Sequence, residues 1–184
     1  FQCEQTAGGK GCAGKAGVCG KPADVAVKQD VLTAALIGLA RAAEGKTPDA
    51  ATDDLVMQGL FATITNVNFD GARIDALTRE VRAAAARLGT AAEPAPETLF
   101  HGEANTVSLR SLVLFGMRGI AAYAWHARVL GVTDPTVNAF FYKGLREIMR
   151  EHALPEWLAL VKQCGLVNLD CMAALDKANT QTYG

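Results

Sequence analysis

Three of the five cysteines lie within the first nineteen residues, in a stretch with few apolar side chains that could pack together. They are Cys3, Cys12 and Cys19, and the residues between them are rich in Gly and Lys. Such a segment becomes ordered only if something other than a hydrophobic core organises it. Thiolates are soft, anionic ligands that suit zinc and iron–sulfur clusters. The cysteines therefore predict a metal centre held by thiolates.

The gaps between these cysteines favour one kind of centre. Eight residues separate Cys3 from Cys12, six separate Cys12 from Cys19, and no histidine is close. Structural zinc sites usually draw on cysteine pairs two to four residues apart, whereas iron–sulfur clusters accept longer loops whose backbone N–H groups reach the sulfides. An iron–sulfur cluster is the favoured interpretation. A zinc site and a flexible arm with incidental thiols are the alternatives, because three cysteines are one short of a usual set.

The other residues that could do chemistry have simpler explanations. Cys164 and Cys171 are seven apart and fall on one face of an expected helix, so we expect buried structural thiols. His126 and His152 fit core or capping positions, and His101 fits a solvated linker. No carboxylate–histidine pair points to acid–base catalysis, so no catalytic residue is predicted in this chain.

Composition sets limits on partners and location. Eighteen basic residues against nineteen acidic ones leave a net charge of −1, which gives no field that would steer the chain to nucleic acid or anionic lipid. The apolar runs are too short to span a bilayer, and no secretory signal is recognisable. We expect a cytoplasmic protein that binds neither nucleic acid nor membranes. Since Phe1 is not an initiator residue, we also expect a fragment or a processed product.

The elements that must position the cysteine segment are helical. Apolar residues recur at helical spacing in six segments, and no strand is convincing. The start signals are Pro22, Thr47-Pro48 or Thr52, Asp70, Asp134-Pro135 and Pro155. The prediction is an all-α fold of two tandem three-helix bundles preceded by a Cys/Gly-rich loop. Its parts are a cysteine-rich loop at 1–21, a first bundle at 22–89, a Pro-rich linker at 90–105 and a second bundle at 106–184.

Several segments resemble the hybrid cluster proteins, also called hydroxylamine reductases or prismane proteins, and together they span essentially the whole chain. They are FQCEQT at 1–6, GC at 11–12, GVCGKP at 17–22, QD at 29–30, LFATITNVNFD at 60–70, AAYAWHA at 121–127 and LDKANTQTYG at 175–184. A relative within the carbon monoxide dehydrogenase superfamily is a further alternative, but the first and fifth of these segments argue against it.

The resemblance implies a cofactor and its ligands. Family members hold an N-terminal cluster with four cysteines, [4Fe-4S] in most members and [2Fe-2S] in some. By position, Cys3, Cys12 and Cys19 match the second, third and fourth ligands, and the first is expected immediately before Phe1. The short gap between Cys3 and Cys12 resembles the [4Fe-4S] branch, although the next gap is one residue longer than in that branch.

The resemblance also implies a longer parent protein in which different domains carry the relay cluster and the reductase site. The family's hybrid iron–sulfur–oxygen cluster, where hydroxylamine or nitric oxide is reduced, lies in later α/β domains that are absent from residues 1–184. This chain is therefore expected to be an electron relay, inactive as a reductase alone, whose partners are those α/β domains and a redox donor protein. The alternative from another class is a non-enzymatic helical interaction module whose cysteine arm binds zinc or nothing.

Overall fold

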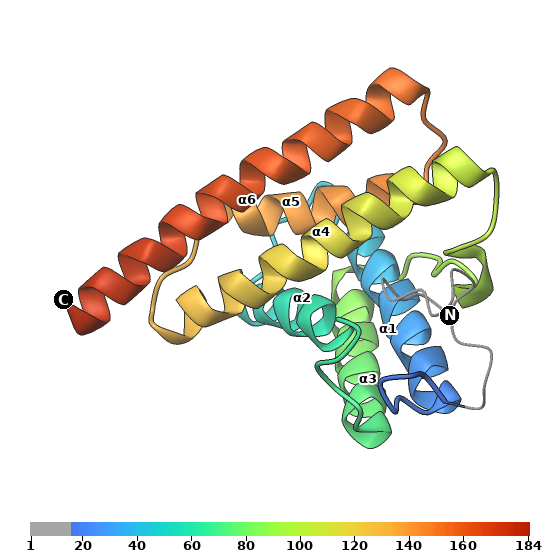
Figure 1. Cartoon of the computed structure of the whole chain (residues 1–184), viewed down its shortest axis with the longest axis horizontal. Helices are drawn as coiled ribbons and strands as arrows, with labels where there is room; N and C mark the ends of the chain where they lie inside the picture. The colour runs from blue at the N-terminus through green and yellow to red at the C-terminus, as the bar shows by residue number, and fades with distance from the viewer. Residues whose placement is uncertain (1–15) are drawn as a thin grey trace.

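The computed structural model describes residues 16–184, and this part of the chain is helical, with no strand beyond an isolated bridge between Ala16 and Pro22. The expected all-α class is confirmed. The elements are α1 (Ala23–Ala42), α2 (Ala50–Ala62), α3 (Gly71–Leu88), a 3-10 turn η2 (Pro96–Thr98), α4 (Ala104–Val129), α5 (Pro135–Glu147) and α6 (Leu154–Tyr183) (Figure 1).

Carboxylate caps fix where several of these helices begin. Asp70 accepts hydrogen bonds from the backbone N–H groups of Ala72 and Arg73 at the start of α3. Asp134 does the same at the start of α5, directly before Pro135. Both caps are as predicted, because a short acidic side chain satisfies N–H groups that the first turn leaves unpaired.

The start of α2 differs from the prediction. Neither Thr47-Pro48 nor Thr52 caps the helix; Asp49 does, accepting from the Thr52 backbone N–H at 2.8 Å and from the Thr52 hydroxyl at 2.6 Å. A carboxylate can accept both bonds at once, which places Thr52 inside the helix as a donor.

The helices pack in two sets of three, and α1 and α3 run steeply across the direction of α4 and α6 (Figure 1). Helices α1, α2 and α3 contact one another, as do α4, α5 and α6, while α2 packs on α4 and α1 packs on α5. Buried side chains of both sets form one apolar cluster, from Leu36 in α1 to Met117 in α4 and Phe141 in α5. The division into two bundles with a boundary at residue 90 therefore stays a prediction.

A shallow groove runs between α4 and α6. Glycines at 116, 119 and 165 line it, together with Leu112 and Tyr123, and its volume is about 420 Å³. Leu112 and Tyr123 fall on the apolar stripe of α4, yet 55% and 45% of their surfaces are exposed. The small residues leave this side of the helix pair open.

Within the described residues, α4 and α6 are long and apolar enough to cross a membrane by length and composition alone. Core helices of soluble proteins pass the same test, and the apolar residues of α4 supply much of this core, including Val113, Leu114 and Ile120.

Arginine side chains hold the segment between α3 and α4 in place. Arg82 makes two bonds, of 2.9 and 2.7 Å, to the Glu93 carboxylate. Arg41 donates to the carbonyl of Ala92. Arg110 donates to the carbonyls of Thr98, Leu99, His101 and Ile148. The segment has linker composition but is fixed to both sets of helices.

Candidate metal centre

Cys19 is the one predicted ligand that falls within the described residues; Cys3 and Cys12 lie outside them. It sits on a tight turn in which Gly17 N–H donates to the carbonyl of Lys21 and Gly20 N–H donates to that of Gly17, both at 2.8 Å. Gly20 has a φ of +88°, a backbone conformation that glycine adopts without strain. The turn presents the Cys19 thiol at the surface, and an exposed thiol on a fixed loop suits a cluster ligand.

Gly17 makes room for the thiol. A Cβ atom at this position would lie 3.1 Å from the Cys19 Sγ, closer than ordinary van der Waals contact. The close approach of backbone to sulfur fits the short Gly-rich loops in which N–H groups surround a thiolate-bound cluster.

The turn is anchored to the helices by a buried hydrogen-bonded chain. Lys21 is only 6% exposed, and its Nζ donates to Gln29 Oε1 at 2.7 Å. Gln29 in turn donates from Nε2 to the carbonyls of Ala62 and Asn68, each at 3.2 Å. The cysteine turn is thereby tied to α1 and to the connection between α2 and α3.

Further polar groups extend this chain inward, and we call Lys21, Gln29, Asp30, Thr33 and Arg118 the buried polar cluster. Arg118 of α4 is 1% exposed; its Nη2 donates to Thr33 Oγ1 at 2.9 Å, and its guanidinium lies 5.5 Å from the centre of the Phe115 ring. Thr33 donates to the carbonyl of Gln29. The cluster joins the cysteine turn, α1 and α4.

Asp30 carries the one carboxyl group of this cluster, and the pKa of that group is strongly shifted. Burial raises its pKa from 3.8 to about 6, although the positive charges of Arg118 and Lys21 act in the opposite direction. Its Oδ1 is buried without a hydrogen-bond partner. Desolvation without full compensation disfavours the charged form.

Asp30 also lines a cavity of about 270 Å³ that it shares with Val27, Glu97, Phe100 and His101. His101 and Glu97 are exposed residues of the segment between α3 and α4. The cavity therefore connects a buried carboxyl group with the surface.

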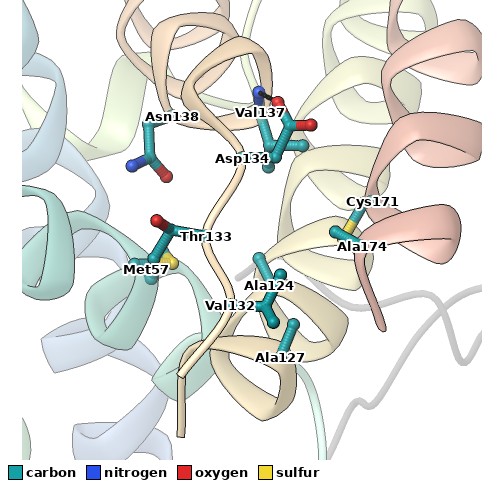
Figure 2. Close-up of a pocket in the computed structure, with 10 residues that line it drawn as sticks. All are labelled: Met57, Ala124, Ala127, Val132, Thr133, Asp134, Val137, Asn138, Cys171 and Ala174. Atoms are coloured by element: carbon teal, nitrogen blue, oxygen red, sulfur yellow. Dashed lines mark hydrogen bonds between the residues drawn. The ribbon is translucent and has the colours of Figure 1, made fainter. Parts of the chain in front are cut away.

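The two C-terminal cysteines are not brought near Cys19. Cys164 and Cys171 are buried, and burial raises the pKa of each thiol to about 11. Cys171 donates to the carbonyl of Ile120 at 3.4 Å. It lines a pocket of about 10 Å³, barely room for one water molecule, and Figure 2 labels no second thiol and no histidine among the described residues around it. Both are buried structural thiols, as predicted.

The histidines have structural surroundings. His152 Nε2 lies 3.0 Å from the carbonyl of Glu147, and the ring packs edge-on against Trp157, which fits the expected capping role. His101 is exposed, as predicted. His126 is exposed as well and tilts against Phe61, so it is not a core histidine. Among residues 16–184, no three His, Cys, Asp or Glu side chains converge as a metal site.

The sequence pattern did not predict that the side chains of Arg118 and Asp30 are buried. Charged residues are rarely buried to this degree, so their type predicted exposure. The available signal was position: Arg118 interrupts an apolar run, LVLFGMRGIAAYAW at 112–125, at a place where helical periodicity requires a buried side chain.

A family model described as Prismane/CO dehydrogenase family matches residues 1–184. Among similar curated proteins are hydroxylamine reductases from Nitratidesulfovibrio vulgaris, 38% identical, Syntrophobacter fumaroxidans, 41% identical, and Desulfitobacterium hafniense, 41% identical. Each match covers 100% of this chain and 39–40% of the relative. The chain thus spans about 40% of the length of the curated relatives it matches.

Proposed function

The chain belongs to the Prismane/CO dehydrogenase family, and from this premise we propose that it is the N-terminal iron–sulfur domain of a hydroxylamine reductase. The observation that carries the proposal is similarity along the whole chain to proteins of that name. Because the chain spans only part of their length, the reductase activity is assigned to a longer protein and not to these residues alone.

The proposed cofactor is a cluster held by Cys3, Cys12 and Cys19, [4Fe-4S] in preference to [2Fe-2S], with a fourth cysteine expected upstream of Phe1. Such a cluster would accept and release one electron at a time. The exposed Cys19 thiol and the close approach of Gly17 support the assignment. Lys21 lies two residues from Cys19, and a hydrogen bond to Gln29 holds it in place. Its ammonium group supplies positive charge beside an anionic cluster.

The proposed role of this cluster is to relay electrons to the later domains. A relay needs a position near the surface and no substrate pocket. The exposure of Cys19 and the anchoring of its turn support that role. Reduction of hydroxylamine, or of nitric oxide, is assigned to the hybrid iron–sulfur–oxygen cluster of the later domains.

Two partners follow from this role: a redox donor protein at the cysteine turn, and the α/β domains of the parent protein. The open groove between α4 and α6 supports the second contact, since Leu112 and Tyr123 leave apolar surface uncovered there. A cytoplasmic location is proposed with them.

The test is anaerobic reconstitution with iron and sulfide, followed by metal analysis and a visible absorption spectrum. It is run on this chain and on a version extended by one N-terminal cysteine. A [4Fe-4S] centre gives about four iron and four sulfide per chain. Cys19→Ser should lower the iron content, whereas Cys164→Ala should leave it unchanged because that thiol is buried in the second set of helices.

A colourless product that holds zinc, or a fold that is indifferent to iron chelators, would contradict the proposal. Either result would favour the helical interaction module with a zinc-binding or unliganded arm.

A further inference from the structure

Three charged side chains are buried together beside the cysteine turn. The exposed fractions of Lys21, Asp30 and Arg118 are 6%, 8% and 1%. Lysine, aspartate and arginine are almost never buried to this extent unless they are paired. Two cations and one carboxylate give this group a net positive charge when all three are ionised.

Asp30 is the member of this group that can exchange a proton. Lysine and arginine ordinarily keep their protons throughout the neutral range. Burial raises the pKa of Asp30 to about 6, so a modest change of nearby charge moves it across neutral pH. Its unpartnered Oδ1 leaves one carboxyl oxygen without a donor that would fix the ionised form.

A path for the proton exists. The cavity of about 270 Å³ runs from Asp30 to the exposed residues Glu97 and His101. A space of this size holds several water molecules, and both rim residues can pass a proton to water. Asp30 is thus buried but within reach of solvent protons.

Asp30 is also linked to the cysteine turn. It follows Gln29, which accepts the hydrogen bond from Lys21, and the Lys21 charge acts directly on the Asp30 carboxyl group. Lys21 is two residues from Cys19. Lys21 and Asp30 are both buried, so we expect a change of charge beside Lys21 to act on Asp30 with little screening by solvent.

We propose that Asp30 binds a proton when the cluster at the cysteine turn is reduced; this inference rests on the proposed function. An external one-electron reductant supplies one electron to the cluster. One proton from solvent adds to a carboxyl oxygen of Asp30, so the group becomes neutral as the cluster becomes more negative. No other bond forms or breaks.

The groups facing Asp30 set the pH range of this coupling. Lys21 from the turn and Arg118 from α4 act on Asp30 through their positive charges, while Glu97 and His101 lie across the cavity. Below about pH 6 Asp30 is protonated in both redox states, and well above that value it is ionised in both. The cluster potential should therefore fall with rising pH in a window that begins near pH 6.

The test is a redox titration of the cluster-loaded chain, with dithionite as reductant and the cluster followed by electron paramagnetic resonance. In the unsubstituted chain the midpoint potential should fall with rising pH in this window, by up to about 59 mV for each tenfold change in proton concentration. In Asp30→Asn the potential should be independent of pH. His101→Gln should retain the slope, because His101 lines the path and is not the group that holds the proton.

A second measurement does not depend on the folding of a variant. The infrared difference spectrum of the unsubstituted chain, reduced minus oxidised, should show the C=O stretch of a protonated carboxyl group. The proposal is overturned if that band is absent, if Asp30→Asn keeps the slope, or if His101→Gln loses it. A chain that takes up no iron at all would instead contradict the proposed function.

Discussion

Single residues decide the shape of the turn that carries Cys19. Gly20 has a φ of +88°, and an L side chain there would be strained even though no atom lies within 4 Å of its Cβ position. Two residues further along, Lys21 fixes the turn to Gln29. The conformation of the thiol-bearing loop therefore depends on one backbone angle and one buried hydrogen bond.

Gly20→Ala should weaken cluster binding without a steric clash. The substitution costs about 1–2 kcal/mol of left-handed strain, which the turn can relieve by moving Cys19. Gly45→Ala is a matched control, since Gly45 has a φ of +73° and equally open surroundings but caps no cysteine turn. Iron content after reconstitution and chelator-driven iron loss measure the effect. Equal iron retention in both variants would contradict it.

Asp30 should make the stability of the metal-free chain depend on pH. Its folded-state pKa, about 6, lies above the ordinary 3.8, so the folded state binds the proton more tightly. Stability from this group is complete below about pH 4 and is lost as pH rises through 6. Asp30→Asn should therefore raise the free energy of unfolding at pH 7, by at most about 3 kcal/mol at 1.4 kcal/mol per pKa unit.

Urea unfolding of both proteins between about pH 4 and pH 8 measures this difference, which should vanish at the acid end if the assignment holds. Other carboxylates titrate in both proteins, so only the difference between them carries the information. A difference that is constant across the range would show that Asp30 does not titrate there.

At the scale of helices, the sequence predicted most boundaries because their causes are local. Asp70, Asp134 and Gly89 act on their own backbone neighbours, so each end could be predicted without knowing the fold. Asp49 was missed because Thr47-Pro48 carried a competing start signal only two residues away. Pro22 and Pro155 mark the starts of α1 and α6 in the same local way.

What the sequence could not predict depends on contacts between distant segments. Leu112 and Tyr123 fall on an apolar stripe, yet the glycines that line the groove between α4 and α6 leave them uncovered. Arg118 and Thr33 are 85 residues apart and meet only when α1 packs against α4. For the candidate site, the spacing of the cysteines was enough to propose thiolate ligands. The buried polar cluster beside them could not be predicted from the sequence.

Gly116→Ala should push α4 away from α6. A Cβ atom at position 116 would lie 2.6 Å from the Cys164 Sγ, and such overpacking typically costs about 1–3 kcal/mol. Gly119→Ala, on the same helix with nothing within 4 Å, should instead stabilise by up to about 1 kcal/mol through helix propensity. Urea unfolding compares the two variants.

Adding Cys164→Ala to the Gly116→Ala chain should restore part of the lost free energy of unfolding. It removes the sulfur atom that the new methyl group would meet. Full additivity of the two substitutions would show that the sulfur is not the cause.

At the scale of the whole molecule, the two sets of helices share one core. Leu36 of α1 is completely buried within the same apolar cluster as Met117 and Trp157. Ion pairs also cross between the sets: Arg128 of α4 binds Asp54 of α2 through two bonds, of 2.8 and 3.0 Å. These contacts imply that the two sets unfold together.

Leu36→Ala should shift the unfolding of both sets equally. The substitution removes buried atoms from the first set and typically costs about 2–5 kcal/mol. The two tryptophans, Trp125 and Trp157, report on the second set, whereas circular dichroism reports on all helices. Both probes should move to the same lower urea midpoint. A tryptophan midpoint that stays in place while helical signal is lost would mean that the sets unfold separately.

The arginine contacts to the segment between α3 and α4 have a consequence for proteolysis. Proteases need several residues of extended, detachable backbone, and they usually cut Pro- and Ala-rich connections first. Here the carbonyls of Ala92, Thr98, Leu99 and His101 are already bound by arginine side chains. Brief digestion should therefore spare this segment, and the chain should not separate into an N-terminal and a C-terminal half at the place where its composition suggests a joint.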